Sequence, residues 1–244
     1  MNKGIYKIES NERIAKNIYK MILSGDTSSI TKPGQFINIS LEPFFLRRPI
    51  SVCDYDDNSI TIIYKVVGKG TDYMSMLKKG DTLDVLCGLG NGYNVDKSED
   101  KPLVIGGGVG VPPLYNLAKK LIEKGKKPIV LLGFGTKDEV FYEDEFKALG
   151  CIVKVSTVDG SYGTKGIVTD ILPDKSDYNY FFTCGPLVMM KALSNAIDAD
   201  GQLSFEERMG CGFGACVGCS IQTKNGIKRI CKEGPVLEKG EIIW

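Results

Sequence analysis

Short apolar stretches separated by turn signals fill the first part of the chain. Five stretches rich in β-branched and aromatic residues recur, at residues 4–8, 14–23, 36–41, 49–55 and 59–67. Turn sequences such as KPGQ and DDNS lie between them, and no long helical pattern intervenes. This rhythm predicts a small antiparallel β-barrel or sandwich over residues 1–96, followed by the polar linker NVDKSEDK.

From Pro102 onward, buried apolar stretches alternate with amphipathic ones. Strands are predicted at residues 102–108, 128–135, 151–158 and 178–186, and helices at residues 112–125 and 186–197. Apolar strands that alternate with amphipathic helices indicate a parallel sheet with helices on its faces. We therefore expect an α+β multidomain chain with a central α/β domain over residues 102–200 and a C-terminal segment over residues 201–244.

Three glycine-containing loops follow the predicted strands, at residues 106–113, 133–137 and 183–186. In a parallel sheet such loops gather at the carboxyl edge, where ligands bind. The first loop has proline where a dinucleotide fingerprint has its third glycine, so alone it also fits an ordinary strand-to-helix turn. Together the loops favour a nucleotide. The candidate contacts are Gly108, Gly110, Cys184, Gly185 and Pro186.

The β-rich part has its own candidate ligand site in the sequence LRRPIS, residues 46–51. The Arg48 guanidinium is a rigid fork suited to a pyrophosphate, and Ser51 can donate to or accept from a ring nitrogen. The stretch 63–65 follows on a later predicted strand, and Gly70 and Thr71 lie at a possible helix start that offers a second anion site. The alternative is a surface Arg-Pro turn that enters a strand.

The C-terminal segment concentrates cysteines in RMGCGFGACVGC, residues 208–219, with a further one in RICKEGP. The spacing Cys-x4-Cys-x2-Cys followed by a distant cysteine is typical of plant-type 2Fe-2S clusters. The four candidate ligands are Cys211, Cys216, Cys219 and Cys231. A structural zinc site remains the alternative, although zinc sites favour two paired Cys-x2-Cys knuckles and this segment has one. Of the other four cysteines, only Cys184 lies in a candidate ligand loop.

Composition narrows the function classes. The 244 residues carry 31 lysines and arginines against 30 acidic residues, so no strong field favours nucleic acid or an anionic membrane. No apolar run approaches the ~20 residues that span a bilayer, and charge is scattered through the N-terminal stretch where a secretory signal would be apolar. We expect a cytoplasmic protein whose thiols stay reduced, which argues against a disulfide framework.

Taken in order, these motifs resemble those of a known family. An Arg-Pro-x-Ser strand, a Gly-x-Gly-Thr helix start, a glycine-rich turn and a Cys-Gly-Pro loop resemble the ferredoxin reductase family across residues 1 to about 200. With the cysteine segment, the whole chain resembles the electron-transfer subunits of class 1B, NAD-dependent dihydroorotate dehydrogenases. One common feature is absent, a C-terminal aromatic that closes the α/β domain over the flavin, because Trp244 follows the cysteine segment.

The resemblance implies an FAD-binding barrel over residues 1–96, an NAD-binding domain over 102–200 and a 2Fe-2S segment over 201–244. The residues that would contact FAD are Arg48, Pro49, Ile50, Ser51, Ile63, Tyr64, Lys65, Gly70 and Thr71. No side chain is assigned a catalytic role, since hydride transfer to a flavin requires no imidazole base and the chain has no histidine.

The implied function is electron transfer in pyrimidine biosynthesis. Electrons from dihydroorotate would pass from the FMN of a catalytic partner subunit through the 2Fe-2S cluster and FAD to NAD. Nothing in this chain resembles a β/α barrel that could hold dihydroorotate and FMN. The expected assembly is a heterotetramer with two copies of each chain.

Two other interpretations stay open from the sequence. Small subunits of hydrogenases, sulfide dehydrogenases and ferredoxin-NADP oxidoreductases share the same architecture but serve other partners. A nucleotide-sensing module with a structural zinc belongs to a different class. The choice between NAD and NADP is also open, because Lys137 could contact a 2′-phosphate or simply be solvated beside Asp138.

Overall fold

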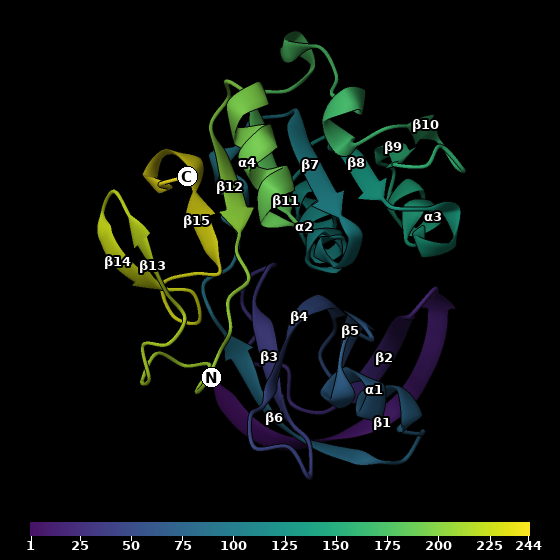
Figure 1. Ribbon diagram of the computed structural model, residues 1–244, viewed down its shortest axis with the longest axis vertical. Coiled ribbons are helices and arrows are strands. Elements are labelled where there is room, and N and C mark those ends of the chain that lie inside the picture. The colour runs from purple at the N-terminus through teal and green to yellow at the C-terminus, as the bar shows by residue number, and fades with distance from the viewer.

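The computed structural model describes residues 1–244. Figure 1 shows a barrel at the bottom, a helix-covered sheet at the top, and the C-terminal segment along one side of both. None of the helices has the length and apolar character needed to cross a bilayer.

The N-terminal barrel is closed by six antiparallel strands in the order β1-β2-β5-β4-β3-β6. Their bounds are β1 Asn2–Ala15, β2 Ile18–Ser24, β3 Phe36–Ser40, β4 Arg48–Tyr55, β5 Ser59–Lys65 and β6 Thr82–Leu89. Sixteen buried apolar residues, among them Ile8, Met21 and Ile62, fill its interior. Helix α1, Lys69–Met76, follows β5 at one end of the barrel. The predicted β-rich unit is thus a closed barrel.

Two features of the barrel differ from the sequence-based expectation. The predicted stretch 14–23 is divided between β1 and β2, because Asn17 adopts a left-handed conformation with φ 58° and turns the chain. Strand β6 was not among the predicted stretches. It alternates buried positions with half-buried ones after an exposed first residue, and it closes the barrel between β1 and β3.

The central domain is built on a seven-stranded sheet in the order β10-β9-β8-β7-β11-β12-β15. The predicted strands correspond to β7 Pro102–Gly107, β8 Ile129–Phe134, β9 Ile152–Thr157 and β11 Tyr180–Cys184, while β10 is the short pair Thr164–Lys165. Helices α2 Pro112–Glu123, α3 Glu143–Ala148 and α4 Leu187–Ala196 connect them. Every pairing in the sheet is parallel except that of β12 with β15.

Both faces of this sheet are buried, which explains the continuous apolar runs of its strands. One face packs in a hydrophobic cluster that includes Leu114 and Leu117 of α2 and Phe146 of α3. The other face packs in a second cluster with Met190 and Leu193 of α4. The expected α+β architecture, with an antiparallel barrel and a parallel-sheet domain, is confirmed.

The C-terminal segment is joined to the central sheet. Strand β12, Gly201–Ser204, pairs with β11, and β15, Val236–Glu238, pairs with β12. The expected boundary between residues 200 and 201 therefore falls at the first residue of a sheet strand. Between these strands lie the cysteine loop and the hairpin β13 Ser220–Thr223 and β14 Gly226–Arg229. Short 3₁₀ turns complete the chain, at Val95–Lys97, Gly108–Gly110, Lys137–Glu139, Val168–Ile171, Lys175–Asp177 and Lys239–Glu241.

The barrel and the central domain share a hydrophobic core. Ile18, Cys53 and Ile63 of the barrel belong to the same buried cluster as the α2 side of the sheet. Polar contacts reinforce this junction, because Asn116 Nδ2 donates to Asp54 Oδ1 at 2.7 Å and Lys119 Nζ lies 3.1 Å from Asp54 Oδ2. These contacts hold strand β4 against helix α2. Strand β4 begins at the Arg-Pro-x-Ser motif, and helix α2 follows the first glycine loop.

Candidate functional site

A pocket of about 670 Å³ lies where the barrel, the central domain and the C-terminal segment meet. Its barrel side contains all nine residues predicted to contact a flavin: Arg48, Pro49, Ile50, Ser51, Ile63, Tyr64, Lys65, Gly70 and Thr71. Their strands β4 and β5 are neighbours in the barrel, so two stretches that are separate in the sequence line one cavity.

The opposite wall was not predicted. It is formed by Val109 of the first glycine loop, by Ser204 at the end of β12 with residues 205–207 and Met209 after it, and by Pro235 before β15. Phe36 and Phe44 of the barrel complete the apolar lining. Residues 204–209 have no ligand motif of their own, and their only sequence signal is that they directly precede the cysteine loop.

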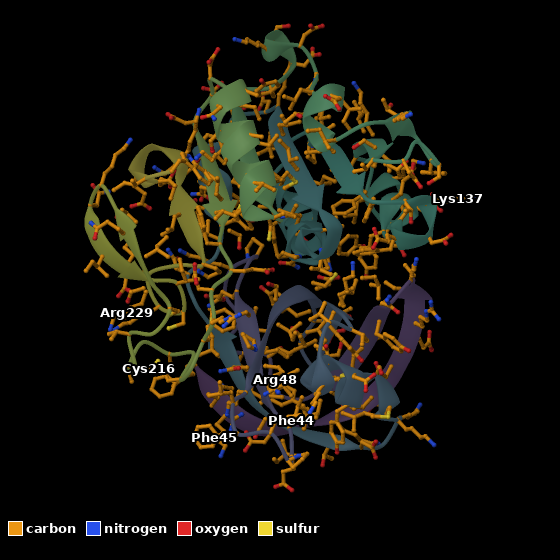
Figure 2. The ribbon with its side chains drawn as sticks, in the orientation of Figure 1. Phe44, Phe45, Arg48, Lys137, Cys216 and Arg229 are labelled. Carbon is orange, nitrogen blue, oxygen red and sulfur yellow. The ribbon has the colours of Figure 1, made fainter.

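Arg48 lines the pocket and lies against the start of helix α1. Its guanidinium stacks 4.6 Å from the centre of the Phe44 ring and donates to the Leu46 carbonyl; Figure 2 labels Arg48 and Phe44 side by side. A Cβ atom on Gly70 would come within 2.2 Å of Arg48 Nε. Gly70 therefore makes room for the guanidinium at the helix start.

The turn before α1 is held by the Thr71 hydroxyl, which accepts from the backbone N–H groups of Val67 and Gly68 at 3.0 and 3.3 Å. This leaves the following N–H groups of the first helical turn directed toward the pocket end of α1, where a helix favours negative charge. The arrangement suits a phosphate group beside a fixed arginine.

At the carboxyl edge of the sheet, the first and third glycine loops touch. A Cβ on Gly110 would lie 2.2 Å from the Cys184 carbonyl oxygen, so only glycine permits this approach. Cys184 itself is buried at the end of β11, and burial raises the pKa of its thiol well above the usual range. The loop of Cys184, Gly185 and Pro186 therefore offers its backbone, and not the thiol, to a ligand.

The second glycine loop is linked to the barrel by an ion pair. Lys65 Nζ lies 3.0 Å from Glu139 Oε1, and Glu139 Oε2 accepts from the Gly135 N–H at 3.1 Å. The Lys65 ammonium lowers the pKa of Glu139. Lys137, in the same loop, is exposed and lies at the outer edge of the central domain (Figure 2).

The four cysteines of the C-terminal segment are brought together in two pairs. The Cys211 N–H donates to Cys216 Sγ at 3.4 Å, and the N–H groups of Ala215 and Cys216 donate to Cys211 Sγ at 3.2 and 3.4 Å. In the second pair, the Cys231 N–H donates to Cys219 Sγ at 3.4 Å. No three of these side chains surround a single point as the ligands of one ion would; the contacts join them two by two.

Burial and hydrogen bonding act in opposite directions on these thiols. Burial works to raise the pKa of Cys211, but backbone N–H groups, led by that of Cys216, lower the pKa to about 6 and favour the thiolate. Burial and the neighbouring Cys219 raise the pKa of Cys231 to about 12. Thiolates that accept backbone N–H bonds, arranged as two pairs, fit a cluster with two irons and two protein ligands on each.

The cysteine loop is anchored from both sides. Arg229 Nη1 donates to the Gly214 carbonyl at 2.7 Å while its guanidinium pairs with Glu233. Asn38 of barrel strand β3 donates to the Cys211 carbonyl at 3.4 Å. Figure 2 shows Cys216 and Arg229 on the same side of the molecule, close to the barrel. Cys216 is the exposed member of the four, so the cluster loop reaches the surface there.

Comparison with known proteins agrees with this arrangement. Residues 206–243 match the model of the iron-sulfur cluster binding domain of dihydroorotate dehydrogenase B. Residues 104–195 match the oxidoreductase NAD-binding domain. The two matches cover the cysteine loop and the glycine loops of the central sheet.

Solved structures share the fold. The NADH-dependent reduced ferredoxin-NADP oxidoreductase has a chain 32% identical to this one, with a TM-score of 0.90 over 99% of this chain and 90% of that chain. Phthalate dioxygenase reductase, at 16% identity and a TM-score of 0.68, covers 91% of this chain and 86% of its own and shows the fold alone. The barrel, the parallel sheet and the cysteine segment define an NAD-linked oxidoreductase of the ferredoxin reductase fold.

Curated relatives define the family more closely. The dihydroorotate dehydrogenase B (NAD(+)) electron transfer subunit of Fusobacterium nucleatum is 47% identical over 94% of both chains. The corresponding subunit of Bacillus mycoides is 42% identical over 100% of this chain and 99% of its own. The chain belongs to the family of dihydroorotate dehydrogenase B electron transfer subunits, which confirms the resemblance found in its sequence.

Proposed function

We propose that this protein carries electrons between the FMN of a catalytic dihydroorotate dehydrogenase subunit and NAD, through a 2Fe-2S cluster and FAD. The observation that carries the proposal is the shared pocket wall. Residues 204–207 and Met209 line the cavity that contains the predicted flavin contacts, and Cys211 follows two residues after Met209. A flavin in this pocket would lie between the nucleotide loops and the cluster loop.

Each part of the chain has a distinct role in this proposal. Arg48 and the start of α1 would bind the FAD pyrophosphate, and Ser51 would contact its ring system. The backbones of Gly108, Gly110 and the 184–186 loop would position the nicotinamide of NAD. Cys211 and Cys216 would hold one iron and Cys219 and Cys231 the other. FAD, when bound, exchanges hydride with NAD and single electrons with the cluster.

The partner supplies the dihydroorotate chemistry in this proposal. The exposed edge of the cluster loop at Cys216 is where the catalytic subunit would dock, and the assembly would contain two copies of each chain. The ferredoxin-NADP oxidoreductase relative supports a second candidate, the same electron-transfer chemistry with a different partner. Its lower identity, 32% against 47%, favours the dihydroorotate dehydrogenase assignment.

A reconstitution assay tests the proposal. The isolated chain, loaded with FAD and cluster, is expected to reduce ferricyanide with NADH and to leave dihydroorotate unchanged. Addition of an FMN-containing dihydroorotate dehydrogenase subunit should start the formation of orotate and NADH. Orotate production by the isolated chain, or NAD reduction by a complex that has lost its cluster, would show that the proposed electron path is wrong.

A further inference from the structure

Strand β3 is the part of the barrel that faces both proposed cofactor sites. Ile37 and Ile39 belong to the barrel core. Because successive residues of a strand point to opposite sides, Phe36 and Asn38 point outward. Phe36 lines the flavin pocket, and the Asn38 amide reaches the cysteine loop. Two outward positions on one strand therefore contact the two sites between which electrons would pass.

The backbone of Asn38 is held in place by its neighbours in the barrel. Its carbonyl accepts from Arg47 Nη1 at 3.2 Å, and Arg47 Nη2 forms an ion pair with Asp84 Oδ1 at 2.8 Å. In the β3–β4 register Asn38 lies opposite Pro49, which lines the flavin pocket. The backbone that carries the amide is thus fixed to the strand that forms one wall of that pocket.

The Asn38 amide provides a close contact with the cysteine loop. Its Nδ2 donates a long hydrogen bond, 3.4 Å, to the Cys211 carbonyl, and no other hydrogen bond joins the barrel to residues 208–219. Gly212, with φ 80°, makes the approach possible, because a Cβ atom there would lie 2.4 Å from Asn38 Nδ2. The barrel therefore holds the backbone of the first predicted cluster ligand.

An amide at this position carries a free-energy cost. Asn38 is 1% exposed, and its Oδ1 atom has no hydrogen-bond partner. A buried carbonyl without a partner destabilises a fold, whereas an apolar side chain of similar size would fill the position without that loss. The hydrogen bond to Cys211 is what distinguishes Asn38 from such an apolar residue. The amide is therefore explained by the ligand that it holds and not by the packing of the barrel.

Cys211 is held at its sulfur end by the loop itself. Its Sγ accepts from the N–H groups of Ala215 and Cys216 at 3.2 and 3.4 Å. It is also the ligand that follows the pocket wall, two residues after Met209. A shift of the Cys211 backbone therefore changes the separation between the cluster site and the pocket.

We propose that Asn38 is a positioning residue that sets the separation between the cluster and the flavin, and with it the rate of electron transfer between them. This inference rests on the function proposed above. NADH gives the flavin a hydride, which is two electrons and one proton; the electrons pass singly to the cluster, and the proton leaves to water. Asn38 takes part in neither step. It acts through the Cys211 backbone, so its loss slows the passage of the electrons and leaves the transfer of hydride intact.

The test separates the two steps in the full chain with Asn38→Leu, which keeps the approximate size of the side chain but cannot donate a hydrogen bond. Iron and FAD contents are measured first, because their absence from the unaltered chain would refute the proposed function and not the role of Asn38. Anaerobic NADH is then mixed with the protein, and stopped-flow absorbance follows the flavin and the cluster separately. Amide hydrogen exchange of the cysteine loop is recorded in the cluster-free chain, independently of turnover.

We expect Asn38→Leu to leave flavin reduction by NADH nearly unchanged. Reduction of the cluster by the flavin should slow severalfold, and the amides of residues 211–216 should exchange severalfold faster. The midpoint potential of the cluster should stay the same, because Asn38 bonds to a carbonyl and not to a ligand sulfur.

Two further variants complete the comparison. Asn38→Ala also lacks the donor but adds no bulk, and it replaces the leucine variant if that chain does not fold. Ser40→Ala, two residues along the same strand, is the matched control and should behave as the unaltered chain in every measurement.

Four outcomes would overturn the inference. Cluster reduction in the Asn38 variants at the rate of the control excludes the role. A proportional fall of both steps would show that the side chain only supports the fold. A shifted midpoint potential that accounts for the slower step would assign the effect to the electronics of the cluster and not to its position. Because the exchange measurement requires no iron, a variant that loses its cluster but exchanges like the unaltered chain also contradicts the proposal.

Discussion

At the scale of single residues, the closest fit in the pocket is between Gly70 and Arg48. The guanidinium occupies the space that any side chain at position 70 would need. A methyl group there must displace Arg48 or move the start of α1. Arg48 can take this position because Gly70 has no side chain. This steric constraint supports the proposed phosphate site.

We expect Gly70→Ala and Arg48→Ala to weaken FAD binding in the same way. Loss of charge-assisted hydrogen bonds costs roughly 1.5–3 kcal/mol, or about tenfold or more in Kd. Both variants should lose FAD on gel filtration and keep their iron. Gly240→Ala, where no atom lies within 4 Å of the added Cβ, is the control. Full FAD retention with unchanged affinity in both variants would exclude Arg48 as the pyrophosphate ligand.

The cysteines of the C-terminal segment and the buried cysteines of the core should respond differently to substitution. Anaerobically purified protein should contain about two iron atoms per chain. Cys216→Ser removes an exposed member of one thiol pair and should strip or alter the visible cluster spectrum. Cys151→Ser changes a buried thiol of the central domain and should leave the spectrum intact. Stoichiometric zinc without iron, measured by elemental analysis, would contradict the cluster assignment.

At the scale of elements, the sequence predicted the strands whose own residues form a continuous apolar run of sufficient length. The runs at 102–108 and 178–186 are apolar because both faces of the sheet are covered, and their lengths are typical of strands. Strands β12 and β15 contain four and three residues. These short segments are strands because β12 pairs with both β11 and β15. Such pairing between distant segments cannot be predicted from the residues of either strand alone.

The same reason explains which half of the pocket could be predicted. The barrel side contains recognisable motifs in continuous stretches, such as the Arg-Pro-x-Ser motif that begins strand β4. Residues 204–207 and Met209 become a pocket wall only because β12 and β15 carry the C-terminal segment across the central domain.

The pairing of β12 makes the C-terminal segment necessary for the central sheet. A chain that ends at residue 200 would expose the backbone edge of β11 and remove the buried Leu203 and Leu237 from the α4 side of the core. We expect this chain to be insoluble or to aggregate. Full-length Cys216→Ser, which loses the cluster but keeps the sheet, should stay soluble. A soluble 1–200 chain with a cooperative melting transition by circular dichroism would show that the segment is dispensable.

At the scale of the whole molecule, the outer edge of the nucleotide domain bears on the choice of cofactor. Lys137 is exposed, and its backbone N–H donates to Ser161 Oγ at 2.8 Å. Asp138 follows it in the sequence, and Asp159 accepts a hydrogen bond from the backbone N–H of the same Ser161. A single lysine among carboxylates offers little to a 2′-phosphate, which is often accommodated by arginine.

We therefore expect flavin reduction by NADH to be faster, and to saturate at lower concentration, than reduction by NADPH. Stopped-flow measurement of the flavin absorbance on the loaded chain checks this preference. Lys137→Ala should change the NADH rate little, since the side chain is solvated. A clear preference for NADPH would favour the ferredoxin-NADP sibling over the dihydroorotate dehydrogenase assignment.

The return of the chain to one sheet also determines how the cluster loop is tethered. The segment leaves the sheet after Ser204 and rejoins it at Val236, directly opposite in the β12–β15 register. Residues 205–235 therefore form a loop whose two ends are held together by the β12–β15 pairing. The rate of single-electron tunnelling falls steeply with distance. The number of residues between Ser204 and Cys211 sets how far the cluster loop lies from the sheet and the pocket. We therefore expect an insertion or deletion of one residue there to change the rate of electron transfer between the cluster and the flavin while all four cysteines remain in place.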